Sequence, residues 1–127
     1  MPKHKKLAAA ESEVMDCVWQ MPGKVTVREV HNRLYPNSEK AYTTLQTVMN
    51  ILVDKNFLRK KKIGMVNFYT ANIRREDAMK TETRSLVSRI FHGSFGALAT
   101  HLIKSGELSA AELDDIKKLI EAQEKTT

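Results

Sequence analysis

The stretch from Ala41 to Tyr69 constrains the fold most, because a helical repeat is followed directly by a hairpin pattern. Its first half has apolar residues at the helical spacing i, i+3, i+4, i+7 and i+8, namely Leu45, Val48, Met49, Leu52 and Val53. The residues that point away from this stripe are polar: Thr43, Thr47, Asn50 and Asp54, with Gln46 on one flank. The predicted helix therefore presents a short, uncharged polar surface near its N-terminus.

The second half of this stretch predicts a basic β-hairpin. Residues 57–63 and 66–70 are rich in aromatic and β-branched residues, and Gly64 lies in the short turn between them. The first strand carries four consecutive cations: Arg59, Lys60, Lys61 and Lys62. A polar-faced helix followed by a basic hairpin is typical of a winged helix-turn-helix, in which the helix reads base edges and the wing holds phosphates.

The residues before this stretch complete the winged-helix order. A first helix is predicted over residues 9–21, with Trp19 as the largest core candidate. Residues 24–25 are expected to pair briefly with the wing, and Thr26 with Glu29 forms a capping box that opens a second helix. The expected fold class is mostly α with a small β-hairpin, as an N-terminal winged helix-turn-helix plus a C-terminal helical dimerisation domain.

Charge divides the 127-residue chain, whose net charge is +6. Residues 1–72 contain 12 Lys and Arg against 6 Asp and Glu, whereas residues 73–127 contain 9 of each class. All the excess positive charge thus lies in residues 1–72, the expected DNA-binding domain, which favours a polyanionic partner there. A short basic arm at residues 3–6 is a further candidate for contact with the DNA backbone.

Residues 73–127 predict three short helices with apolar faces, the last opened by a capping box of Ser109 and Glu112. A segment of this length can hardly bury three such faces alone. The simplest solution is a dimerisation domain in which two copies cover each other, and the alternative is packing against the chain's own winged helix. The residues assigned to the dimer are Leu86, Ile90, Phe91, Leu98, Leu102, Ile103, Leu113, Ile116, Leu119 and Ile120.

Several protein classes are excluded by what the sequence lacks. Cys17 is the single cysteine, so no intramolecular disulfide forms, and it is expected to be a small buried apolar residue. No apolar run approaches the ~18 residues of a membrane span, so a soluble, cytoplasmic protein without membrane insertion is expected. No nucleophile–base pair, metal-ligand spacing or phosphate-binding glycine loop is present, so no enzyme, metal or cofactor is expected.

The chain resembles the BlaI/MecI/CopY family of bacterial transcriptional repressors, also called the penicillinase-repressor family. The resemblance spans roughly Leu7 to Glu121 and is carried by LAAAESEVMDCVWQ, AYTTLQTVMNILVDKNFLRKKKIGMVNFYTA and RIFHGSFGALATHLIKSGELSAAELDDIKKLI. It implies a winged helix with a helical dimerisation domain, and a homodimer that binds inverted repeats in operator DNA. The family's DNA-facing positions correspond here to Ala41, Tyr42, Thr43, Thr44, Gln46 and Thr47.

The resemblance also bears on base contacts. Thr43 and Gln46 stand where many β-lactam-responsive members have Lys or Arg. This leaves an uncharged set for base edges, in which glutamine pairs with adenine and a threonine methyl packs on a thymine methyl: Thr43, Gln46, Thr47 and Asn50. Tyr42 and Thr44 are expected to contact the DNA backbone or to cap the helix.

Two departures from the family concern regulation. Copper-responsive members bind metal through a cysteine-rich C-terminal motif, whereas this chain has no cysteine after Cys17. β-Lactam-responsive members are cleaved at an Asn-Phe bond in the dimerisation domain, and the matching position here is His101-Leu102. Cleavage at this position by a membrane metalloprotease sensor is therefore a hypothesis.

Two other functions are compatible with the sequence. A winged helix also serves as a protein-interaction module, and a weak salt dependence of DNA binding would favour that interpretation. A regulator that responds to a small molecule, bound between the winged helix and the C-terminal helices, is the second alternative. No residue pattern marks a pocket for such a ligand.

Overall fold

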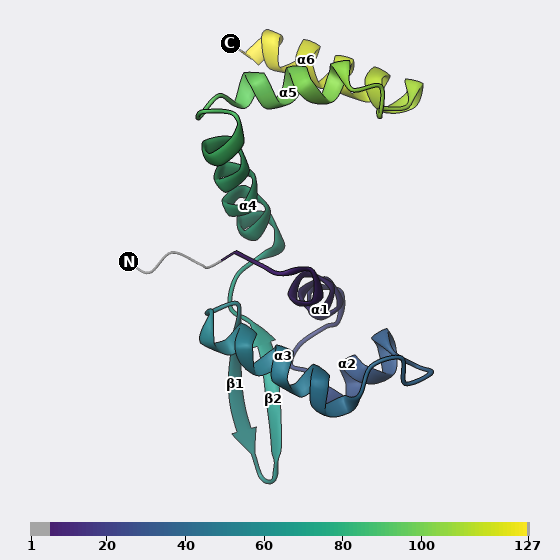
Figure 1. Cartoon of the computed structure of the whole chain (residues 1–127), viewed down its shortest axis with the longest axis vertical. Coiled ribbons are helices and arrows are strands. Elements are labelled where there is room, and N and C mark those ends of the chain that lie inside the picture. The colour runs from purple at the N-terminus through teal and green to yellow at the C-terminus, as the bar shows by residue number, and fades with distance from the viewer. Residues whose placement is uncertain (1–5, 127) are drawn as a thin grey trace. The chain divides into compact units, whose positions relative to one another are not determined.

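The computed structural model describes residues 6–126, which form a winged helix followed by further helices (Figure 1). The elements in order are α1 (Ala9–Gln20), α2 (Val27–Leu34), α3 (Tyr42–Asp54), β1 (Leu58–Ile63), β2 (Val66–Ala71), α4 (Arg75–Ile90), α5 (Phe95–Lys104) and α6 (Ala110–Thr126). This order confirms the expected fold of mostly helices with a small β-hairpin and an N-terminal winged helix. The basic arm expected at residues 3–6 lies outside the described residues, except for Lys6.

Local hydrogen bonds explain where two of the helices begin. At α2, the Glu29 amide donates to the Thr26 hydroxyl oxygen, and the Thr26 amide donates to the Glu29 carboxylate. Ser109 and Glu112 exchange the same pair of bonds before α6. Each box satisfies two amide groups that a helix N-terminus leaves without partners. Both predicted capping boxes are therefore confirmed.

The hydrophobic core of the winged helix lies between α1, α2, α3 and the hairpin. The α3 stripe contributes Leu45, Met49 and Leu52 as buried side chains. The amides and carbonyls of Val25 and Tyr69 bond in both directions, with N–O distances of 2.9 and 2.7 Å. The predicted pairing of residues 24–25 with the wing is therefore confirmed as a single bridge, which adds a third backbone segment to the hairpin.

Trp19 lies at the edge of this core and is only partly buried. Its Nε1–H donates to the carbonyl oxygen of Ile73, at 2.9 Å. A buried indole N–H needs an acceptor, and the edge of the core provides one. Among the described residues the largest fully buried side chain is Tyr69 rather than the predicted Trp19.

The chain divides into two compact units, one ending at Glu82 and the other starting at Thr83. The first half of α4 belongs to the first unit, because Ala78 is part of its core and the Glu82 carboxylate accepts a bond from the Leu7 amide at 3.0 Å. In the described part of the second unit, α5 and α6 contribute no buried side chain. Leu119 is 66% exposed and Ile120 50%. A single copy of the chain leaves these apolar side chains largely uncovered by their own unit.

Within residues 6–126, no helix combines the length and apolar character needed to cross a membrane.

Candidate nucleic-acid interface

The first two turns of α3 present the polar surface that the helical period predicts. Thr43, Thr44 and Thr47 are exposed, and Gln46 is partly buried. The Thr47 hydroxyl donates to the carbonyl oxygen of Thr43, at 3.1 Å, so its proton is used within the helix. Its methyl group and oxygen lone pair remain for a partner. This surface suits contact with methyl groups and hydrogen-bond donors.

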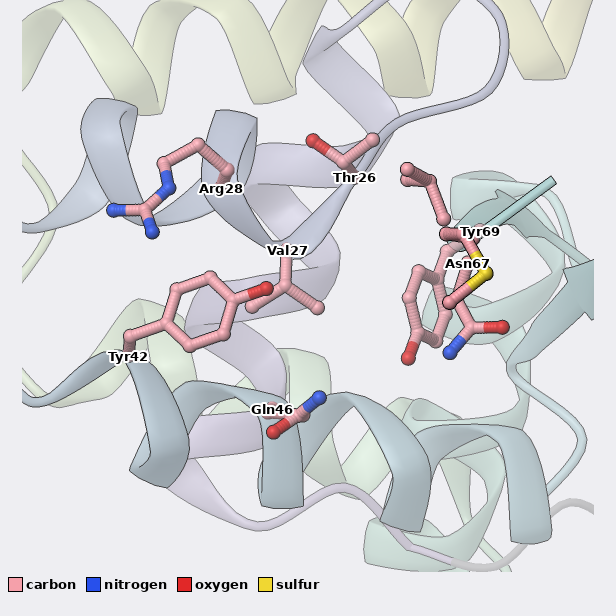
Figure 2. Close-up of a pocket in the computed structure, with 9 residues that line it drawn as sticks. Thr26, Val27, Arg28, Tyr42, Gln46, Asn67 and Tyr69 are labelled. Carbon is pink, nitrogen blue, oxygen red and sulfur yellow. The ribbon is translucent and has the colours of Figure 1, made fainter. Parts of the chain in front are cut away.

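A pocket of about 300 Å³ lies beside this surface, between α2, α3 and the hairpin. Figure 2 shows Arg28 and Tyr42 on one side, Asn67 and Tyr69 on the other, and Gln46 between them. The remaining lining residues are Thr26, Val27, Met65 and Val66. The pocket therefore joins the N-terminal end of α2, the α3 surface and the tip of the hairpin into one concave polar region.

Arg28 is held over an aromatic ring at one wall of this pocket. Its guanidinium carbon lies 4.7 Å from the centre of the Tyr42 ring, which is within cation–π range. Arg28 is exposed, so its N–H groups still face solvent. The stacking restricts the guanidinium to a defined place beside the start of α3, where its charge suits an anionic group such as a phosphate.

Asn50 joins α3 to the hairpin. Its side-chain oxygen accepts hydrogen bonds from the Tyr69 hydroxyl and from Lys60 Nζ, both at 3.1 Å. Burial raises the pKa of Tyr69, and the nearby Tyr42 raises it further, so this phenol stays protonated and donates. Of the four residues predicted for base edges, Asn50 and Thr47 thus already make hydrogen bonds within the protein, Asn50 as an acceptor and Thr47 as a donor.

The hairpin register separates the four predicted wing cations onto two faces. Directly paired residues on antiparallel strands share a face. Lys60 pairs with Tyr69 and Lys62 with Asn67, so these two lysines lie on the face that lines the pocket. Arg59 and Lys61, which pair with Thr70 and Phe68, lie on the opposite face. Of the four cations, only Lys60 and Lys62 therefore lie on the face of the hairpin that is directed toward α3.

The sequence did not single out Arg28 or Asn67, which come from different elements and meet only in the fold. The sequence predicts only a capping role for Thr26. It points to the pocket indirectly, because the capping box places the N-terminus of α2 next to Val25, the residue that pairs with the wing. Such helix ends favour anions.

The residues predicted for dimerisation and cleavage lie in the second unit. Ile90, Leu102 and Ile103 are exposed, as are Leu113, Leu119 and Ile120, while Leu86, Phe91, Leu98 and Ile116 are partly covered. His101 lies on α5 with its ring 5.8 Å from that of Phe91. Among the residues that the structure describes, no three His, Cys, Asp or Glu side chains come together in a way that could hold a metal ion.

A family model described as the penicillinase repressor matches residues 7–122. The penicillinase repressor of Staphylococcus aureus is 21% identical over 118 residues, which cover 93% of each chain. The match to the family model extends through α5 and most of α6, so the similarity is not confined to the winged helix.

Two solved structures resemble the winged helix. The solution structure of the DNA-binding domain of the repressor BlaI is 34% identical, with a TM-score of 0.52, and covers 61% of this chain and 93% of that chain. The monomeric form of Bacillus licheniformis BlaI, in complex with the blaP half-operator, has the same identity and coverage, with a TM-score of 0.50.

Proposed function

Because the chain belongs to the penicillinase repressor family, we propose that it is a DNA-binding transcriptional repressor that binds an inverted-repeat operator as a homodimer. The observation that carries this proposal is the combination of an exposed threonine surface on α3, the polar pocket beside it and the cationic hairpin within one compact unit. The matching family model and the Staphylococcus aureus relative are both named as penicillinase repressors, and the proposal includes no enzymatic activity.

In this proposal α3 lies in the major groove and the hairpin contacts the phosphate backbone. Gln46 pairs with an adenine through its amide, and the methyl groups of Thr43 and Thr47 pack on thymine methyls. Tyr42 and Thr44 contact the backbone at the start of the helix, with Ala41. The wing cations supply the charge that fixes the protein on the duplex: Arg59, Lys60, Lys61 and Lys62.

The dimer follows from the two-fold symmetry of an inverted repeat and from the uncovered faces of the second unit. Two linked DNA-binding domains bind an inverted repeat far more tightly than two separate domains do, because the second contact becomes intramolecular. We place the end of the DNA-binding unit at Glu82 rather than at residue 72. Ala78 belongs to the core of the winged helix, and the Glu82 carboxylate bonds to the Leu7 amide. Residues 83–127 then form the dimerisation unit.

Replacing Gln46 with Ala should weaken binding to an inverted repeat from upstream of the protein's own gene by about tenfold, because a bidentate base contact contributes about 1–3 kcal/mol of discrimination. Affinity for a scrambled duplex should stay the same, since phosphate contacts carry no sequence information. The measurement is a fluorescence anisotropy titration of both duplexes over a range of salt concentrations.

Gln20 is exposed at the end of α1, so Gln20→Ala is the matched control and should leave both affinities unchanged. Wild-type protein that binds both duplexes equally and weakly would overturn the repressor proposal. In that case the basic hairpin is a non-specific surface, and the protein-interaction alternative gains support.

We further propose that release from DNA occurs by cleavage at His101-Leu102 on α5. Both residues are exposed in a single chain, in which a helix without buried side chains opens at little cost in free energy. Co-expression with a membrane metalloprotease encoded beside the gene, in the presence of inducer, should split the chain into two fragments. A Leu102→Asp variant should resist the cut, and a wild-type chain that stays intact under the same conditions would argue against proteolytic release.

A further inference from the structure

His31 is a buried polar side chain that the proposed DNA contacts do not use. It lies on α2 and is 7% exposed. In the described part of the chain, Glu11 is the only other buried polar or charged residue. Glu11 has a cationic partner in Lys55, whereas the hydrogen bond of His31 goes to the backbone. A histidine in such a place needs a structural or functional reason, because burying a polar ring without a partner is costly.

The partner of His31 is the backbone just before α3. Its Nε2 lies 2.7 Å from the carbonyl oxygen of Lys40. A carbonyl oxygen only accepts hydrogen bonds, so Nε2 must carry the proton in this contact. Lys40 precedes Ala41, the N-cap of α3. The bond therefore connects the middle of α2 to the residue that directly precedes the N-cap of α3.

The start of α3 lacks the side-chain cap that commonly fixes the first turn of a helix. Its N-cap is Ala41, whose side chain makes no capping hydrogen bond. The preceding loop, residues 36–41, is exposed throughout and contains Ser38 with φ of 55°. Alanine is among the poorest N-cap residues, so the sequence itself does little to set where and at what angle this helix begins. The His31 bond supplies that constraint from another element.

Aromatic contacts strengthen the same junction. The His31 ring lies 5.9 Å from the ring of Tyr35 and 6.2 Å from that of Tyr42, the first residue of α3. Arg28, one turn earlier on α2, stacks on the same Tyr42 ring. Two residues spaced i and i+3 on α2 thus hold Tyr42 and Lys40, which fixes the first turn of α3 relative to α2.

We propose that His31 is a positioning residue for sequence recognition: it sets the first turn of α3, so that Thr43, Gln46 and Thr47 meet base edges at a defined register. The inference rests on the proposed function, because it assumes that α3 reads DNA. Its consequence is specific. Loss of the His31 bond should reduce discrimination between DNA sequences, since base contacts depend on geometry much more strongly than phosphate contacts do.

The test compares two variants of the full-length protein. His31→Leu fills the same space with an apolar side chain and removes the donor, whereas His31→Gln retains an N–H near the position of Nε2. We expect His31→Leu to weaken binding to the inverted repeat by about tenfold, with the affinity for scrambled DNA and the salt dependence unchanged. His31→Gln should restore most of the loss.

These measurements separate this role from a purely structural one. Equal losses on both duplexes, in step with a lower unfolding temperature, would overturn the proposal, as would no loss on either duplex. Wild-type protein that cannot distinguish the duplexes would instead overturn the proposed function. Nitrogen NMR of the wild-type imidazole gives a test that needs no variant, because a proton on Nδ1 with Nε2 unprotonated would exclude the bond to Lys40.

Discussion

Replacing Ile120 with Asp is expected to convert the protein into monomers and to weaken its binding to an inverted-repeat operator by about 100-fold or more. Ile120 shares one face of α6 with Leu113 and Ile116, and it is half exposed in a single chain. A carboxylate placed in an apolar interface would lose its hydration without gaining a partner. Sedimentation velocity and operator titration would measure the two effects together, and affinity for an isolated half-site should not change.

The matched control is Ala122→Asp, which adds the same charge two residues later. Successive helix positions are about 100° apart, so Ala122 lies on nearly the opposite side of α6. This variant should remain dimeric and bind the operator normally. If Ile120→Asp also remained dimeric with full operator affinity, the apolar face of α6 would not be the dimer contact, and the assignment of α6 to the dimer interface would fail.

Replacing Lys55 with Met should lower the free energy of unfolding by about 2–3 kcal/mol. Lys55 Nζ lies 2.6 Å from the carboxylate of Glu11, which is buried at the start of α1, and it also donates to the carbonyl oxygen of Lys6. Removing the cation leaves a buried carboxylate whose remaining donor, among residues 6–126, is the Ala8 amide. The pair joins the beginning of α1 to the end of α3, and urea denaturation would measure its loss.

The pH dependence gives a control for the same pair. Burial raises the pKa of Glu11, but the hydrogen bond from Lys55, the bond from the Ala8 amide and the charge of Lys55 together lower it below the usual 4.5. A folded pKa below the unfolded one gives stability that is present above pH 4.5 and lost as the pH falls through the folded value. Glu11→Gln should remove this part of the acid sensitivity. Identical acid denaturation of both proteins would show that the pair contributes nothing.

The winged helix could be predicted closely because its information is local. The α3 stripe follows the helical period, and the capping boxes at Thr26 and Ser109 are read from residues three apart. The exposed positions of Thr43 and Thr47 follow from the same period. Patterns of this kind depend only on neighbours along the chain.

The rest of the candidate interface depends on residues that are distant in sequence. Asn50 follows the outward-facing period, yet its oxygen is engaged by Tyr69, because a buried phenol needs an acceptor and Asn50 is within reach. Arg28 and Asn67 meet at the pocket from different elements. His31 belongs to no motif in the sequence. Its role at the start of α3 depends on a backbone carbonyl nine residues away, to which no sequence pattern points.

The two-faced hairpin has a consequence for the DNA that flanks each half-site. The minor groove is about 6 Å wide and is bounded by two rows of phosphates. A ribbon that carries Lys62 on one side and Arg59 with Lys61 on the other can be attracted by both rows at once when it lies edgewise between them. In the proposed complex this attraction would increase as the rows come closer, so binding by the wing would depend on the width of the groove. A·T-rich flanks, whose minor groove is narrow, would strengthen binding although no side chain touches their bases.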